Sequence, residues 1–232
     1  MPTVTLIRHG QAGTRDNYDF LSDTGVEQAR LLGGWLAARN EDFDTILSGS
    51  LQRQIQTARA AFGGTERLSI DPAWNEFDLD GVFAAIVPLL STADPGFAAR
   101  WAAIEADVAS GSAEIHRTWT PADAEVMGAW FNSRFGEIEG VESWPAFHLR
   151  IRRALGALRQ AVDHARIAVF TSALPTAFCI AEALGLEPMA ILSLAGTSYN
   201  TGVTTIGLSG QFTGLISFNV TSHLPTRLLT LR

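Results

Sequence analysis

Short apolar runs alternate along most of the chain with segments in which apolar residues recur at helical spacing. After the first run, Val26, Ala29, Leu32 and Leu36 form such a helical stripe. Strand-like runs lie at 3–7, 45–48, 67–70, 167–171, 203–208 and 213–217. Alternation of strands and helices predicts an α/β fold, a three-layer sandwich with a mostly parallel central sheet and helices on both faces.

The pattern also predicts where helices begin and end. Thr24 and Glu27 have capping-box spacing, which indicates a helix that begins there and ends near residue 39. The last two strands are expected to form a hairpin that turns at Ser209-Gly210. Further helices are predicted on the stripe Leu51, Ile55, Ala58 and Phe62, over 143–165, and over Leu174–Leu184.

Strand signals stop between residues 82 and 140. Asp94-Pro95 and Thr120-Pro121 each place a capping residue before a proline, which is typical of helix starts. We therefore predict one domain over 1–232 with a helical insertion at about 82–140. The insertion holds the aromatic residues Trp101, Trp119, Trp130, Phe131 and Phe135. They either pack the insertion onto the main body, which we favour for most of them, or shape a lid over a substrate pocket.

Composition narrows the class of protein. The 232 residues are 47% hydrophobic, yet no apolar stretch reaches the length of a membrane span, and the first ten residues do not resemble a secretory signal. The single cysteine, Cys179, lies in an apolar run typical of a buried side chain. We expect a cytoplasmic protein.

Charge bears on partners and chemistry. The net charge of −7 argues against nucleic acid or an anionic membrane as a partner. All 17 basic residues are arginine, which excludes Schiff-base lysine chemistry and the lysine-containing phosphate loop. If the protein binds phosphate, arginine side chains, backbone amides and helix ends must do it.

Four segments that follow predicted strands carry candidate chemistry. Arg8-His9-Gly10 ends the first strand, at the sheet edge where open α/β proteins bind ligands. A histidine there can act as a nucleophile or proton carrier near neutral pH. An arginine is permanently charged, and its planar guanidinium has hydrogen-bond donors arranged to bind phosphate. Arg53 falls in the first turn of a helix, where unpaired N–H groups also favour an anion. The other two segments contain Glu76 with Asp78, and Ser172.

Taken in order, these segments resemble the histidine phosphatase superfamily, which is also called phosphoglycerate mutase-like. Arg8 to Gln11 is similar to its Arg-His-Gly-Gln/Glu signature, and Ser48 to Ala58 is similar to its Ser-x-Leu-x-Arg-x-x-Gln-Thr-Ala segment. Further similarities run along the chain at Leu21 to Gly25 with Gln28-Ala29, Glu76, Glu142-Ser143, Phe147, Arg150, Ser217 to Asn219, and His223-Leu224.

The resemblance implies a phosphohistidine mechanism without metal or cofactor. It implies that His9 is the nucleophile, that Arg8 and Arg53 bind the phosphoryl oxygens, and that Glu76, with Asp78 in reserve, is the general acid. The family places a second histidine after its fourth strand, but this chain has Ser172 there, which makes it a divergent member. Ser172 is expected to donate a neutral hydrogen bond to the phosphoryl group. The chain also has Asp80 where the family often has glycine.

The remaining histidines are expected to be solvated or to serve packing. His223 is assigned a structural hydrogen bond, with replacement of the missing imidazole as the alternative. His148 and His164 are placed on the arginine-rich helix, and His116 lies in the insertion.

The predicted function is hydrolysis of a small phosphorylated metabolite by a metal-independent phosphomonoesterase, an enzyme of reduced activity if Ser172 is a poor substitute. The alternative is a catalytically weak or inactive phosphoester-binding protein, and a phosphomutase is less favoured. A nucleotide-binding α/β protein is disfavoured because no Gly-x-Gly-x-x-Gly follows the first strand. A homodimer through exposed tryptophans of the insertion stays open.

Overall fold

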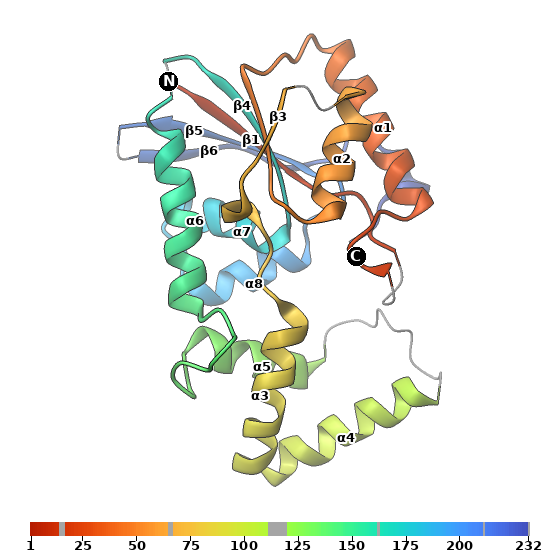
Figure 1. Ribbon diagram of the computed structural model, residues 1–232, viewed down its shortest axis with the longest axis vertical. Helices are drawn as coiled ribbons and strands as arrows, with labels where there is room; N and C mark the ends of the chain where they lie inside the picture. Colours follow the sequence, from red (N-terminus) through yellow and green to blue (C-terminus); the bar gives the residue numbers. More distant parts are fainter. Residues whose placement is uncertain (14–16, 65–66, 111–119, 162, 211, 232) are drawn as a thin grey trace. The chain divides into compact units, whose positions relative to one another are not determined.

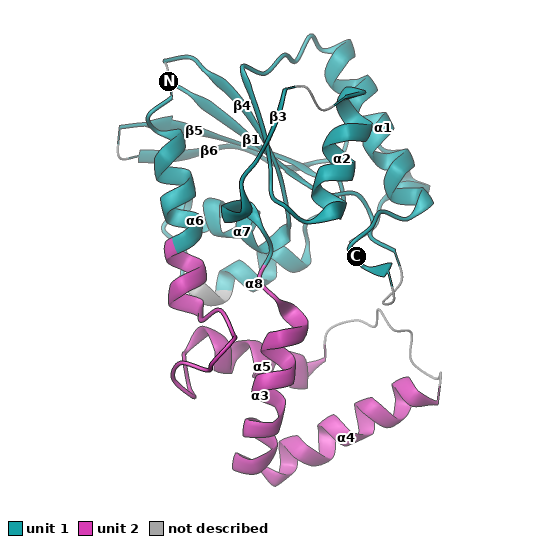
Figure 2. Cartoon of the chain, viewed as in Figure 1, with its two compact units in different colours: residues 1–76, 150–232 teal, residues 77–149 magenta. Residues whose placement is uncertain are grey.

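A computed structural model describes residues 1–13, 17–64, 67–110, 120–161, 163–210 and 212–231. The chain divides into two compact units, which Figure 2 colours separately. The first contains Met1–Glu76 and Arg150–Arg232, and the second contains Phe77–Leu149. The predicted insertion at about 82–140 lies within the second unit.

The first unit is built on a six-stranded sheet in the order β3-β2-β4-β1-β5-β6 (Figure 1). Strands β1 to β4 are mutually parallel, while β5 runs antiparallel to both β1 and β6. The six strands are β1 (Thr3–Arg8), β2 (Thr45–Ser48), β3 (Leu68–Ile70), β4 (Arg166–Thr171), β5 (Val203–Ser209) and β6 (Phe212–Val220). The mostly parallel sheet and the C-terminal hairpin predicted from the apolar runs are confirmed.

Helices cover both faces of this sheet, as the alternating pattern predicts. On one face, Ile7, Ile46 and Phe170 pack in a core with Leu32 and Ala58. Those last two residues belong to α1 (Asp23–Ala38) and α2 (Gln52–Phe62), which cover this face. Helix α7 (Ala173–Leu184) contacts β1, β5 and β6, and α8 (Pro188–Gly196) packs on α7 (Figure 1). The α/β sandwich is thus confirmed.

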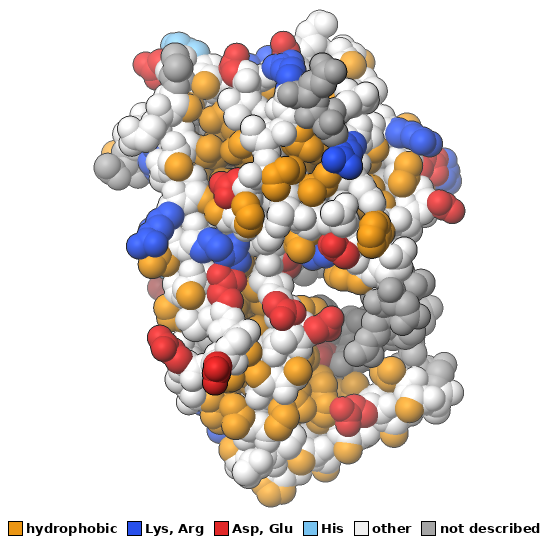
Figure 3. Space-filling model, in the orientation of Figure 1, with side chains coloured by type: hydrophobic (Ala, Val, Ile, Leu, Met, Phe, Trp, Pro, Cys, Tyr) orange, Lys and Arg blue, Asp and Glu red, His pale blue; other side chains and the backbone are white. Residues whose placement is uncertain are grey.

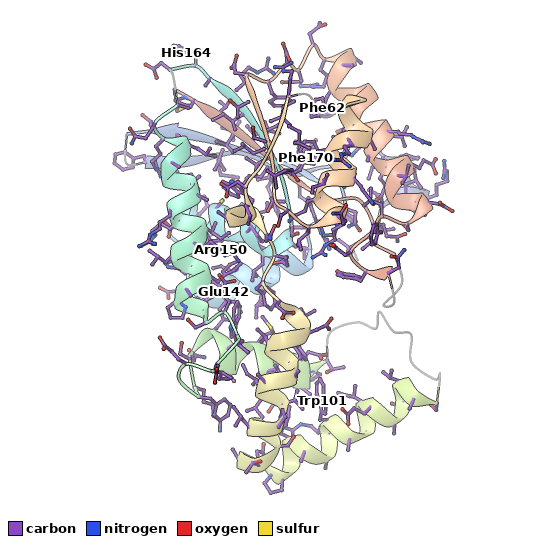
Figure 4. All side chains as sticks on the ribbon, in the orientation of Figure 1. Phe62, Trp101, Glu142, Arg150, His164 and Phe170 are labelled. Carbon is purple, nitrogen blue, oxygen red and sulfur yellow. The ribbon has the colours of Figure 1, made fainter. Side chains whose placement is uncertain are left out.

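A contact between two aromatic rings packs α2 against the sheet. The ring of Phe62 at the end of α2 meets the ring of Phe170 on β4 edge-on, with centroids 5.7 Å apart (Figure 4). Because both rings are apolar and Phe170 is fully buried, this contact joins helix to sheet by packing alone.

Two predicted helix boundaries are wrong. Helix α1 begins two residues earlier than predicted because Ser22, not Thr24, caps it: the Ser22 hydroxyl accepts the Gly25 N–H at 3.1 Å. Helix α6 (Trp144–Leu158) ends before residue 165, since the backbone bonds of the next residues change to i−3 spacing. His164 therefore lies on a turn with φ 66°, not on that helix. Helix α8 was not predicted.

The second unit consists of helices packed around aromatic rings. It contains α3 (Leu79–Ala93), α4 (Pro95–Ala109), α5 (Pro121–Phe131) and the first turns of α6. Asp94 and Thr120 cap α4 and α5 as predicted. None of the helices in the described ranges has the length and apolar content needed to span a bilayer.

The aromatic residues of this unit pack against one another. Trp130 stacks on Phe77 with centroids 4.6 Å apart and also contacts Phe131, Trp144 and Phe147. Trp101 packs on two further rings, those of Phe83 and Phe97. Trp101, Trp130 and Phe131 thus pack within the second unit. Their packing of the insertion onto the main body stays a prediction, and Trp119 and His116 fall outside the described residues. The lid and the homodimer stay predictions.

Candidate active site

The predicted site residues lie at the carboxyl edge of the parallel strands. Arg8 at the end of β1 is paired in register with Thr171 at the end of β4. His9 and Ser172, the next residues, therefore leave the edge side by side. The His9 N–H donates to the Thr171 carbonyl at 2.9 Å, and the His9 carbonyl accepts from the Asn200 side chain at 3.1 Å. These bonds hold the His9 backbone from the end of β4 on one side and from the turn before β5 on the other.

Gly10 brings the loop after β1 against two helices. A Cβ at this position would lie 2.6 Å from the Gly25 carbonyl oxygen, so only glycine allows the close approach to α1. The Gly10 N–H donates to the Thr57 hydroxyl at 2.9 Å, and that hydroxyl donates to the Arg53 carbonyl at 2.6 Å. The loop that carries His9 is thereby tied to the first turns of α2, which carry Arg53.

The His9 imidazole is arranged as a neutral base with one open nitrogen. Its Nδ1 lies 2.8 Å from the Gly10 carbonyl oxygen, which can only accept, so Nδ1 carries the proton. Burial, and then the positive charges of Arg53 and Arg8, hold the pKa of His9 well below its usual value. At neutral pH the ring is therefore uncharged, and Nε2 keeps its lone pair.

Two buried guanidinium groups accompany this ring. Arg8 donates through Nη1 to the carbonyls of Ser198 and Leu231, and burial lowers its pKa. Arg53 donates through Nη1 to Asp19 Oδ1 at 3.0 Å. Among the described residues, the Nε atoms of both arginines are buried without a hydrogen-bond partner. Buried donors are normally paired, so an acceptor such as an anion would be stabilised at either of these two nitrogen atoms.

Sequence reasoning missed Asp19, which lies beside Arg53. Its carboxylate also accepts the N–H of Gln52, the first residue of α2, at 3.2 Å. The Tyr18 ring lies 5.0 Å from the Arg53 guanidinium, in a cation–π contact. No local sequence signal marks Asp19, because its partner is 34 residues away.

Glu76 reaches the start of α7. Its Oε2 accepts the N–H of Leu174 at 3.1 Å, two residues after Ser172. Arg150 on α6 steadies the segment before Glu76 by donating to the carbonyls of Ala73 at 2.8 Å and Asn75 at 3.0 Å (Figure 4). The structure thus places the Glu76 carboxylate at the same helix end as Ser172.

Asp78, the reserve candidate for the acid, belongs to the second unit. Its carboxylate accepts the Gly81 N–H at 3.0 Å and caps α3. This contact gives Asp78 a structural role at a helix end.

Ser172 is fully buried at the N-cap of α7, but its hydroxyl makes no cap bond. Its Oγ instead accepts the Gln54 amide at 2.9 Å. Gln54 was not among the predicted site residues. A signal was present, because this polar residue sits three positions after Leu51 and four before Ala58, on the apolar side of its helix.

Two other side chains have structural surroundings. His223 Nε2 bonds the Thr201 hydroxyl at 2.9 Å, and burial lowers the pKa of its ring to about 4. This is the structural hydrogen bond predicted for it. Cys179 is buried as predicted, and burial raises the pKa of its thiol. The described ranges contain no group of three or more His, Cys, Asp or Glu side chains arranged to hold a metal ion.

The family follows from the match of its sequence model. The model of the histidine phosphatase superfamily (branch 1) matches residues 4–114 and 104–221. The chain belongs to the histidine phosphatase superfamily.

Solved structures of this class share the fold. A phosphoserine phosphatase from Entamoeba histolytica, in complex with 3-phosphoglyceric acid, is 20% identical with a TM-score of 0.62, covering 97% of this chain and 100% of that one. The α-ribazole phosphatase from Shigella flexneri is 20% identical with a TM-score of 0.61, covering 94% and 96%. A mycobacterial glucosyl-3-phosphoglycerate phosphatase with inorganic phosphate is 19% identical with a TM-score of 0.60, covering 96% and 99%.

Proposed function

We propose that this protein hydrolyses a small phosphomonoester through a phosphohistidine at His9, without a metal ion. The observation that carries the proposal is the pair of buried, unpartnered Nε atoms of Arg8 and Arg53 around a neutral imidazole. Two permanent cations that share a buried site with an open nucleophile are suited to a phosphoryl group. The three phosphatase structures similar to this chain support the same class of reaction.

In the first step, His9 Nε2 attacks phosphorus while the bond from phosphorus to the substrate oxygen breaks. Arg8 and Arg53 stabilise the charge on the phosphoryl oxygens, and Glu76 gives its proton to the departing alkoxide. In the second step, water attacks the phosphorus atom and the bond to Nε2 breaks. Glu76 takes the proton of that water, phosphate leaves, and His9 is neutral again.

Ser172 is proposed to donate a hydrogen bond to the phosphoryl group. It lacks the charge of an imidazolium, and loss of one such donor typically costs about 10²–10³ in rate. The alternative function, a weak or inactive phosphoester-binding protein, rests on this substitution.

The substrate is expected to be a small phosphorylated molecule. On the face shown in Figure 3, arginine side chains of the first unit lie in separate groups with acidic side chains between them. A continuous basic surface, which nucleic-acid binding requires, is not formed on that face. The absence of nucleic-acid and membrane partners and the cytoplasmic location stay predictions.

The test is hydrolysis of p-nitrophenyl phosphate by the wild-type protein and by His9→Ala. We expect phosphate release by the wild type and a loss of at least about 10³-fold in the variant, because the nucleophile is gone. His164→Asn is the matched control: His164 is exposed before β4, at the opposite end of that strand from Ser172, and asparagine tolerates its positive φ.

Mass spectrometry of a rapidly quenched reaction should find a phosphoryl group on His9. Equal rates for wild type and His9→Ala would refute the hydrolase. Binding of inorganic phosphate by a wild type that shows no turnover would support the alternative, a phosphoester-binding protein.

A further inference from the structure

Gln54 connects three parts of the candidate site through a fully buried amide. It follows Arg53 directly on α2. Its Nε2 lies 3.2 Å from the carbonyl oxygen of Trp74, two residues before Glu76, and 2.9 Å from the hydroxyl of Ser172. The Thr171 hydroxyl donates to the same Trp74 carbonyl at 2.6 Å. One amide thus contacts both the segment before the proposed acid and the start of α7.

The orientation of this amide is determined by its neighbours. A carbonyl oxygen only accepts, so the Gln54 atom that faces Trp74 must be the NH₂ group. The amide oxygen then faces the N–H of Leu51, at 3.4 Å. Gly49 leaves room for it, since a Cβ at that position would lie 2.0 Å from Oε1. Both hydrogens of Nε2 are therefore directed, one toward Trp74 and one toward Ser172.

This orientation fixes the direction of the bond to Ser172. Because Gln54 Nε2 can only donate, Ser172 Oγ accepts, and the proton of the Ser172 hydroxyl is not used in that bond. Within the described part of the chain, Ser172 Oγ has no acceptor for this proton. The hydroxyl follows β4 beside His9. The two guanidinium groups that act on His9, those of Arg8 and Arg53, each have an Nε without a partner among the described residues.

We propose that Gln54 is a positioning residue: it holds the Ser172 hydroxyl as a hydrogen-bond donor toward the phosphoryl group bound at His9. This inference rests on the proposed function. A serine hydroxyl without a fixed partner rotates and can donate in other directions. When its oxygen accepts a hydrogen bond from Gln54, its proton is directed away from Gln54 and can be donated to another acceptor. Gln54 and Ser172, both buried, together supply a preorganised neutral hydrogen-bond donor at the start of α7, because serine itself has no charge to offer the phosphoryl group.

The test is a double-mutant cycle of Gln54→Met and Ser172→Ala, with kcat and KM measured for p-nitrophenyl phosphate. Methionine keeps the length of the side chain and removes the amide. We expect kcat to fall about 10–100-fold in each single variant, with KM within about threefold, because the lost bond acts mainly in the transition state. If Gln54 acts through Ser172, Gln54→Met should change kcat less than about twofold in the Ser172→Ala background.

If Gln54 has a purely structural role, Gln54→Met should lower kcat in the Ser172→Ala background by as much as it does in the wild type. That result would overturn the inference. Gln54→Glu keeps the shape of the side chain and serves as a second variant if the Gln54→Met protein does not fold. Its carboxyl group accepts from Ser172 and reverses the bond, so kcat should fall at least as far as in Ser172→Ala. A wild-type kcat in Gln54→Glu would also refute the proposal.

The cycle is repeated on the binding of inorganic phosphate by isothermal titration calorimetry, which needs no turnover. Each single variant should weaken binding about 2–3-fold, in line with the small change in KM, and the double variant should bind no more weakly than Ser172→Ala. A failure of the proposed hydrolase function would be recognised separately, because wild type and His9→Ala would then have equal rates. The double-mutant cycle on phosphate binding would still decide the role of Gln54. Additive losses in phosphate binding would overturn it.

Discussion

The two compact units bury polar groups in opposite ways. The first unit buries Arg8, His9 and Arg53 together, and two of their nitrogen atoms have no partner among the described residues. In the second unit, the buried carboxylate of Asp123 accepts both the N–H and the hydroxyl of Thr120 at 2.7 Å and so closes the cap of α5. The other buried side chains among the described residues of this unit are apolar, and six of these thirteen are aromatic.

The difference separates function from stability. A buried donor of a cationic group that has no partner destabilises the folded state, and such donors persist where a ligand or a reaction uses them. Satisfied caps and stacked rings stabilise a helix bundle and need no ligand. Substitutions in the first unit should therefore change chemistry more than stability, and those in the second should do the reverse.

The largest effect on stability is expected for Trp130→Ala in the second unit. The ring is buried and contacts four other aromatic rings. Its removal should lower the free energy of unfolding of residues 77–149 by about 3–5 kcal/mol. Hydrogen exchange of the amides of α3 and α5 measures this loss. The control is Trp101→Ala, at a half-buried ring, which should lower the free energy of unfolding clearly less. Equal losses of unfolding free energy in the two variants would contradict the aromatic-core interpretation.

Arg53→Gln should give the reverse result in the first unit. The kcat/KM for a phosphomonoester should fall about 10²–10³-fold, since a charged transition-state donor is lost. The free energy of unfolding should change by less than about 1 kcal/mol, because the cost of burying a guanidinium with an unpartnered Nε offsets the loss of its half-exposed ion pair with Asp19. The control is Arg59→Gln, an exposed arginine on the same helix, which should keep the wild-type rate.

The pH profile of Arg53→Gln sharpens this prediction. The positive charge of Arg53 helps to keep the pKa of His9 below 6.5. Without it the pKa of His9 rises toward 6.5, so the acid limb of kcat/KM moves to higher pH. An unchanged acid limb would show that Arg53 does not act on His9.

The pH dependence of stability should also originate in the first unit. Burial lowers the pKa of His223 from 6.5 to about 4. Between these values the unfolded chain binds a proton that the folded chain does not, so stability is full above pH 6.5 and decreases as the pH falls toward 4. The expected loss between pH 6.5 and 5 is about 1–2 kcal/mol.

Urea unfolding at the two pH values measures the effect of His223. Replacement by glutamine should reduce the difference between them, whereas His164→Asn, at an exposed histidine, should leave it unchanged. His9, whose pKa is lowered in the same direction, contributes to the part that remains. A difference unaffected by His223→Gln would exclude this residue as a source.

The smallest effect is expected for Asp19→Asn. The ion pair with Arg53 is half exposed on the side of Asp19, and such pairs contribute less than about 1 kcal/mol. KM should therefore rise by less than about fivefold, because Arg53 loses a partner that holds Nη1. Asp42→Asn is the control, since Asp42 forms an exposed pair with Arg67 at 3.3 Å in the same unit and should leave KM unchanged.

Much of the fold followed from patterns that are local in the chain. Six apolar runs predicted six strands, and the parallel order of the first four brought Arg8, His9 and Ser172 to one edge. The cap of α1 was predicted two residues late because Thr24 and Glu27 have the spacing of a capping box. The choice depends on a tertiary contact, since the Ser22 hydroxyl also bonds the Gln11 side chain at 2.9 Å.

The sequence by itself determined the class of fold, the edge at which the candidate site lies, and the residue types available there. Those properties depend on periodicity and on the order of strands, both of which can be read along the chain. The protonated nitrogen of His9, the unpartnered Nε atoms, and the bonds of Asp19 and Gln54 were decided only by the tertiary structure. They depend on contacts between residues far apart in sequence, and on burial, which sets the pKa of each group.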